Sequence, residues 1–186
     1  MPVNDEGAAL HPNICLLLRP GWLDSGPAHW QSRWEVRHHF ERVQQADWSW
    51  PRRGDWMAPP EEVLFADARP ACLVAHSLGC HLVAAWAAHS RSTARVRGAL
   101  LAAPPDLERA DLPAPLAQWS PPVRQRHPFP TRVLYSGDDP CASAESVRKL
   151  AKDWGAESES VGAAGHINGE SGLEDWSGRL AGPQRL

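Results

Sequence analysis

The sequence lacks several features that mark common protein classes. None of its four cysteines forms a Cys-x-x-Cys pair, so a zinc ribbon or a thioredoxin-type site has no support. The glycine patterns of dinucleotide-binding and P-loop phosphate sites are both absent. The net charge of −3 gives no strongly basic surface, so we expect neither nucleic acid nor a membrane surface as a partner.

Long apolar runs are also missing. The first run, residues 14–18, is shorter than the roughly 7–15 apolar residues of a signal peptide, and it ends at Arg19. No stretch approaches the roughly 18 apolar residues of a membrane helix. We therefore expect a cytoplasmic protein with residues 1–11 as a flexible N-terminus. Its cysteines are then expected to be reduced thiols; they are Cys15, Cys72, Cys80 and Cys141.

What the chain does have is an alternation of short apolar runs and segments with helical periodicity. Its 186 residues suit a single domain spanning residues 1–186. Strands are expected at residues 13–18, 41–44, 71–75, 96–103, 132–135 and 158–161. Helices are expected at residues 28–38, 61–68, 78–89 and 144–154, with a last one carrying Leu173, Trp176 and Leu180. This order predicts an α/β fold, a three-layer α/β/α sandwich around a mostly parallel sheet of about six strands.

Two segments are predicted to be loops. Residues 47–60 are rich in Trp, Pro and Arg. Residues 104–130 hold eight of the eighteen prolines, which excludes strand or helix over most of their length. The second loop follows the carboxyl end of a predicted strand, where open α/β sheets bind ligands. We therefore expect it to form one wall of a substrate site, with Trp119 contributing to binding.

The most informative motif is Ala-His-Ser-Leu-Gly at residues 75–79, between a buried strand and an amphipathic helix. A nucleophile elbow needs this context, because a sharp turn projects the serine above the sheet and small residues let strand and helix approach. Gly79 meets that need, and Ala75 replaces the usual glycine. Serine is also a good helix N-cap, so the motif alone fits a structural role too. We predict that Ser77 is a nucleophile.

A nucleophilic serine needs a histidine base and an orienting carboxylate, which follow it in the order acid, then histidine, in this architecture. Asp138 and Asp139 both come directly after a late strand, where they are also typical turn formers. Asp139 precedes a proline, which favours an extended backbone there. His166 lies in a glycine-flanked loop before the last predicted helix. We predict His166 as the base, with both aspartates open as the acid.

An oxyanion hole needs two backbone donors. The amide of Leu78 is the first of the new helix, and the second donor should come from a loop after an early strand. Gly21 permits close backbone approach there, so the amide of Trp22 is the candidate. Gly21 and His29, which follow the same strand, are also candidates for substrate binding. Histidine spacing gives no metal site, and we expect neither a metal nor a cofactor.

The sequence resembles the small serine hydrolases related to the human retinoblastoma-binding serine hydrolase. The matching stretches are residues 20–22, 29–31, 74–79, 102–106, 136–140 and 165–170. The resemblance implies a compact α/β-hydrolase fold with little or no cap domain. It carries over Ser77 as nucleophile and His166 as base, and it favours Asp139 as the acid because the family's acid directly precedes the proline. Cys141 occupies a position that is often aromatic in the family.

These observations predict a serine hydrolase, a carboxylesterase that acts on small acyl esters through an acyl-enzyme intermediate. A small-molecule acyl substrate is the expected partner, and the sequence leaves any protein partner unknown. Two alternatives stay open. One is a non-catalytic binding protein that retains the hydrolase fold. The other is an amidase or acyltransferase that uses the same triad.

Overall fold

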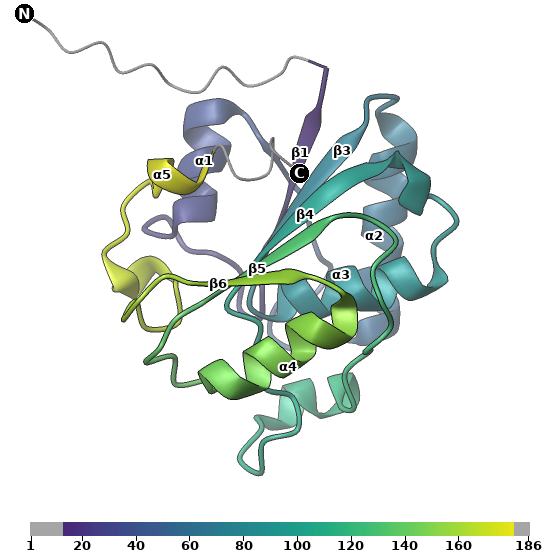
Figure 1. Cartoon of the computed structure of the whole chain (residues 1–186). Helices are drawn as coiled ribbons and strands as arrows, with labels where there is room; N and C mark the ends of the chain where they lie inside the picture. The colour runs from purple at the N-terminus through teal and green to yellow at the C-terminus, as the bar shows by residue number, and fades with distance from the viewer. Residues whose placement is uncertain (1–12, 181–186) are drawn as a thin grey trace, which may run out of the picture.

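The computed structural model describes residues 13–180 and centres on a sheet of six parallel strands in the order β2-β1-β3-β4-β5-β6 (Figure 1). This confirms the predicted fold class. The strands are β1 Cys15–Arg19, β2 Glu41–Arg42, β3 Ala71–His76, β4 Val96–Ala102, β5 Thr131–Tyr135 and β6 Glu157–Ser160. The single domain spanning residues 1–186 stays a prediction. The flexible N-terminus predicted at residues 1–11 lies outside the described residues.

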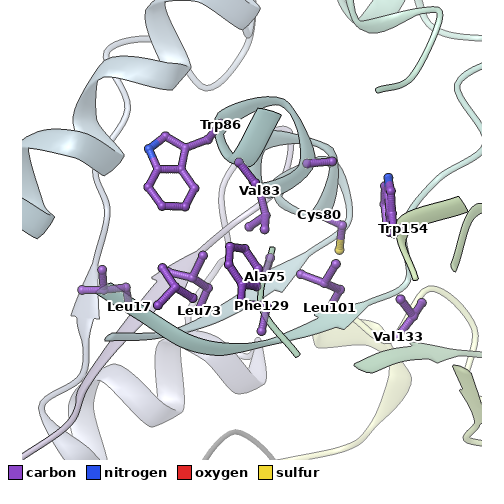
Figure 2. Packing of buried hydrophobic residues seen from close by; sticks show 14 of the residues in the cluster. Leu17, Leu73, Ala75, Cys80, Val83, Trp86, Leu101, Phe129, Val133 and Trp154 are labelled. Atoms are coloured by element: carbon purple, nitrogen blue, oxygen red, sulfur yellow. The ribbon is translucent and has the colours of Figure 1, made fainter. Parts of the chain in front are cut away.

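Helices cover both faces of the sheet. Their bounds are α1 Trp30–His38, α2 Arg53–Ala66, α3 Leu78–His89, α4 Ala144–Trp154 and α5 Ser177–Leu180. Side chains of α2, α3 and α4 pack on one face, and those of α1 pack on the other. In Figure 2, Cys80, Val83 and Trp86 of α3 lie over side chains of β1, β3 and β4. Both faces of β1 and β3 are buried, as their continuous apolar runs require.

Helices α3 and α4 have the predicted bounds because strong local signals fix them. Ser143 caps α4, its hydroxyl accepting a hydrogen bond from the Ser146 amide at 3.0 Å. Gly155 follows the helix in the left-handed conformation, with φ 68°. Within residues 13–180 no helix is both long enough and apolar enough to cross a membrane. None of the four cysteines, which all lie in the described residues, forms a disulfide.

The loop predicted at residues 47–60 is wrong in its second half, because α2 begins at Arg53 and continues through Pro59 and Pro60. An interior proline costs about 3 kcal/mol in a helix. The helix persists because Trp56 is 1% exposed and packs with Trp119, and because Leu64 is also buried. Burial of these large apolar side chains offsets the prolines.

The last predicted helix is mostly wrong as well. Only Ser177–Leu180 is helical, and the backbone before it turns through positive φ at Gly172, Glu174 and Trp176. Trp176 still faces α1, with its ring 5.2 Å from that of Trp30. The apolar spacing therefore reflects packing of an irregular segment and not a helical face.

Replacement of Trp56 by alanine tests this explanation of α2. Because the indole is fully buried, Trp56→Ala is expected to lower the free energy of unfolding by about 3–5 kcal/mol, measured by urea denaturation. Trp50, 49% exposed in the same segment, is the control, and Trp50→Ala should change that free energy by less than about 0.5 kcal/mol. Equal effects of the two replacements would contradict the explanation.

Candidate active site

Ser77 occupies a sharp turn between β3 and α3, with φ 53° and ψ −126°. A non-glycine residue in this region is strained by about 1–3 kcal/mol and persists only when its surroundings enforce it. The Ser77 amide donates to the Ala102 carbonyl at 2.9 Å, and the Ser77 carbonyl accepts from the Cys80 amide at 2.9 Å. The hydroxyl does not cap α3. The turn instead presents the half-buried Ser77 side chain at the carboxyl edge of the sheet.

Two glycines let the backbone approach this turn closely. A Cβ on Gly79 would lie 2.3 Å from the Arg19 carbonyl oxygen. A Cβ on Gly21 would lie 2.7 Å from Ser77 Cβ and 3.1 Å from the Leu78 nitrogen. Any side chain at either position would displace neighbouring backbone or Ser77 itself. The end of β1 is therefore held directly against the turn.

His166 lies between Ser77 and Asp139. Its Nε2 is 2.9 Å from the Ser77 Oγ, and its Nδ1 is 3.0 Å from each carboxylate oxygen of Asp139. The Asp139 side chain is 3% exposed, and one of its oxygens also accepts a hydrogen bond from the Cys141 amide at 2.8 Å. In neutral His166 this geometry places the proton on Nδ1 and leaves Nε2 free to accept the serine proton.

Asp138, the other aspartate considered from the sequence, points elsewhere. It accepts hydrogen bonds from the Ser136 hydroxyl at 2.6 Å and from the Gly165 amide at 2.8 Å. These bonds hold the pKa of Asp138 below its usual value. Asp138 thus ties the loop that carries His166 to the end of β5, while Asp139 contacts the imidazole.

Competing effects set the pKa of His166. Burial lowers it, whereas the hydrogen bond and charge of Asp139, together with the nearby Cys141 thiol, raise it. The net result is a pKa of about 9. Cys141, Asp139 and His166 each offer an atom that can bind a metal ion, and these three atoms lie within 4.8 Å of one another. This is the only such group in residues 13–180. Two of its members, Asp139 and His166, hydrogen-bond each other.

The two amides predicted for the oxyanion hole belong to segments that approach each other at Gly21. Leu78 begins α3, so its N–H belongs to the first turn, which has no intrahelical acceptor. Trp22 follows Gly21, whose backbone contacts Ser77 and Leu78, and the Asp24 amide closes this turn onto the Gly21 carbonyl at 3.2 Å. The positive end of the α3 dipole adds to the favourable potential for a negative charge here.

The remaining two candidates are buried and do not face an open site. His29 is 4% exposed and hydrogen-bonds His76, a residue to which the sequence pattern assigned no specific role. Trp119 is 1% exposed, and its indole donates to the Pro51 carbonyl. The substrate-binding role expected of Trp119 is therefore corrected: its indole packs against Trp56 in the core.

Gly21→Ala tests the close approach of β1 to the turn. The added Cβ would meet Ser77 Cβ, so we expect a loss of about 1–3 kcal/mol in the free energy of unfolding. Gly26 lies in the same loop, where an added Cβ would meet no atom within 4 Å. Gly26→Ala is the matched control and should stay within about 0.5 kcal/mol of wild type in urea denaturation. A Gly21→Ala protein as stable as the control would refute the contact.

Comparisons with known proteins agree with this geometry at the level of fold. A YdeN-like hydrolase from Pectobacterium atrosepticum has 28% identity and a TM-score of 0.80, with 93% of this chain and 91% of that chain covered. The ydeN gene product from B. subtilis has 16% identity and a TM-score of 0.71, with 94% and 100% covered. Esterase RhEst1 from Rhodococcus sp. has 14% identity and a TM-score of 0.65, with 93% and 89% covered.

Among curated proteins none matches the chain. The particular kinship to the human retinoblastoma-binding hydrolase stays a prediction. The family model described as serine hydrolase matches residues 16–181. Because this match spans most of the sequence, the chain belongs to the serine hydrolase family.

Proposed function

We propose that this hydrolase cleaves carboxylic esters of small acyl groups, with Ser77 as nucleophile, His166 as general base and Asp139 as the orienting acid. One observation carries the proposal. His166 joins the serine hydroxyl at 2.9 Å to the Asp139 carboxylate at 3.0 Å, at a strained turn that presents the serine at the carboxyl edge of the sheet. A serine is a weak nucleophile unless a base and an orienting group are arranged in this way.

In the proposed first step, Ser77 Oγ attacks the acyl carbon while its proton moves to His166 Nε2. The ester C–O bond then breaks, and His166 returns the proton to the leaving alkoxide. Water, deprotonated by the same nitrogen, attacks the acyl-enzyme. The bond between the acyl carbon and Ser77 Oγ breaks, His166 returns the proton to Oγ, and the carboxylic acid leaves. Asp139 keeps the imidazole in the Nδ1–H tautomer and stabilises the imidazolium that forms in each step.

The negative oxygen of each tetrahedral intermediate would be bound by the amides of Leu78 and Trp22. Backbone donors fixed by the fold need no reorganisation when this charge develops, which is why such groups lower the barrier. The esterase and thioesterase among the structural neighbours share 14% and 18% identity with this chain, so they support the fold and leave the acyl bond to be tested.

A fluorophosphonate probe tests the proposed nucleophile. Wild-type protein should gain one adduct by intact mass, located on the peptide that contains Ser77. Ser77→Ala should gain none, and Ser146→Ala, which alters a serine on α4, should label like wild type. A folded wild-type protein that stays unlabelled would overturn the proposal and favour a binding protein. If labelling succeeds, products formed with competing alcohols or amines separate an esterase from an acyltransferase.

The pH dependence of labelling tests the assigned base. Only neutral imidazole accepts the serine proton, so the rate should rise with pH and level off above the His166 pKa of about 9. Cys141 contributes to raising this pKa, so Cys141→Ala should move the midpoint to lower pH. A rate constant that is flat from pH 6 to 10, or a midpoint that moves upward in the variant, would contradict the assignment.

A further inference from the structure

Two buried histidines connect α1 with the loop that carries His166. The Gln31 amide donates to His29 Nδ1 at 3.1 Å. His29 Nε2 lies 3.3 Å from His76 Nδ1, and His76 Nε2 lies 2.8 Å from the carbonyl oxygen of His166. His29 and His76 are 4% and 5% exposed. The sequence separates them by 47 residues, so this contact is made by the fold.

The two ends of this chain of contacts determine the proton on each ring. The backbone N–H of Gln31 is a donor, so His29 Nδ1 must be an acceptor. The proton of the His29 ring must then sit on Nε2. That N–H then donates to His76 Nδ1, which leaves the second proton on His76 Nε2. The His166 carbonyl can only accept, so it matches this N–H. One arrangement of two neutral Nε2–H rings satisfies every contact.

Both rings are in surroundings that keep them neutral. Burial lowers the pKa of His29 to about 3, with the nearby charges of Arg42 and His166 acting in the same direction. Burial also lowers the pKa of His76 well below its usual value, and His29 and His166 add to this effect. Hydrogen bonding of His76 to the His166 carbonyl opposes the shift without reversing it.

The contacts that run from His29 through His76 end at the main-chain carbonyl of His166, whose imidazole hydrogen-bonds Ser77. The next residue, Ile167, has φ 51°, and its carbonyl accepts from the indole of Trp30 at 2.9 Å. Hydrogen bonds from Trp30 of α1 and from His76 therefore fix the backbone at residues 166 and 167. Asp139 fixes the imidazole. A shift of the His166 carbonyl would carry its ring away from the serine.

We propose that His29 and His76 form a neutral relay that fixes the main chain of His166, and that both are positioning residues for the hydrolytic reaction. The inference rests on the proposed roles of Ser77 and His166. Neither ring touches the reacting atoms. Loss of the relay should therefore lower kcat more than it changes KM, because a misplacement of about 1 Å in a catalytic group can cost 10²-fold in rate.

Paired variants test the relay by activity on a p-nitrophenyl ester. His76→Phe keeps the ring size and removes both nitrogens, so kcat should fall by about 10- to 100-fold with KM changed less than about threefold. His76→Gln restores an N–H near the His166 carbonyl and should recover much of kcat. His127→Phe, at another buried histidine that stacks on Trp154, is the control for ring replacement and should keep the wild-type kcat.

His29→Asn separates the relay from the helix cap. Asparagine is a good N-cap and can still accept from the Gln31 amide, but it is too short to reach His76. We expect a folded protein of lower thermal stability, because part of a buried ring is lost, and a kcat between those of wild type and His76→Phe. This variant leaves the elbow sequence intact, so it decides the question even if His76→Phe does not fold. A kcat within twofold of wild type in His29→Asn and in every folded His76 variant would overturn the proposal.

Long-range ¹H–¹⁵N spectra of the histidine rings test the relay without reference to activity. His29 and His76 should both appear as neutral Nε2–H tautomers that do not titrate from pH 5 to 9. A neutral Nδ1–H tautomer in either ring, or titration in this range, would overturn the proposal. If wild-type Ser77 fails to react with the fluorophosphonate, the proposed function falls, and the positioning role falls with it. If Ser77 labels normally but His29 or His76 has the Nδ1–H tautomer, the relay is refuted and the proposed function stands.

Discussion

The arrangement of the candidate site depends on one constraint, the left-handed backbone of Ser77. The conformation is costly for a residue with a Cβ, and it is enforced by the backbone bond to β4 and by the start of α3. It also requires close approach of the chain at Gly21 and Gly79. The contacts that enforce this strained backbone also bring the Gly21 loop to the turn. Ser77 and the amides around it are therefore positioned by the same contacts.

The parallel sheet supplies the other groups at the same edge. All six strands run in one direction, so the segments that follow β3, β5 and β6 emerge at the same edge of the sheet. Asp139 follows β5, and His166 follows β6. Asp138 and His76 then fasten the His166 loop by hydrogen bonds to Gly165 and to the His166 carbonyl. Position along the sheet brings the groups near each other, and buried polar contacts set their final distances.

The sequence predicted the parts that depend on local pattern. Continuous apolar runs marked the buried strands, and the order of serine, aspartate and histidine placed three side chains that the structure brings together. It failed where tertiary packing outweighed local preference, as at α2, which Trp56 stabilises despite two prolines. Trp119 was misjudged for a related reason, since an aromatic residue in a proline-rich loop can be core or surface. The His29–His76 contact spans 47 residues and has no sequence pattern.

The most direct test of this account is a crystal structure of the protein after reaction with a fluorophosphonate. The account predicts phosphorus bonded to Ser77 Oγ, with the phosphonyl oxygen about 2.7–3.1 Å from the amide nitrogens of Leu78 and Trp22. His166 should remain between Ser77 and Asp139. A phosphonyl oxygen turned away from both amides, or an adduct on another residue, would contradict the claim that the Ser77 turn organises the site.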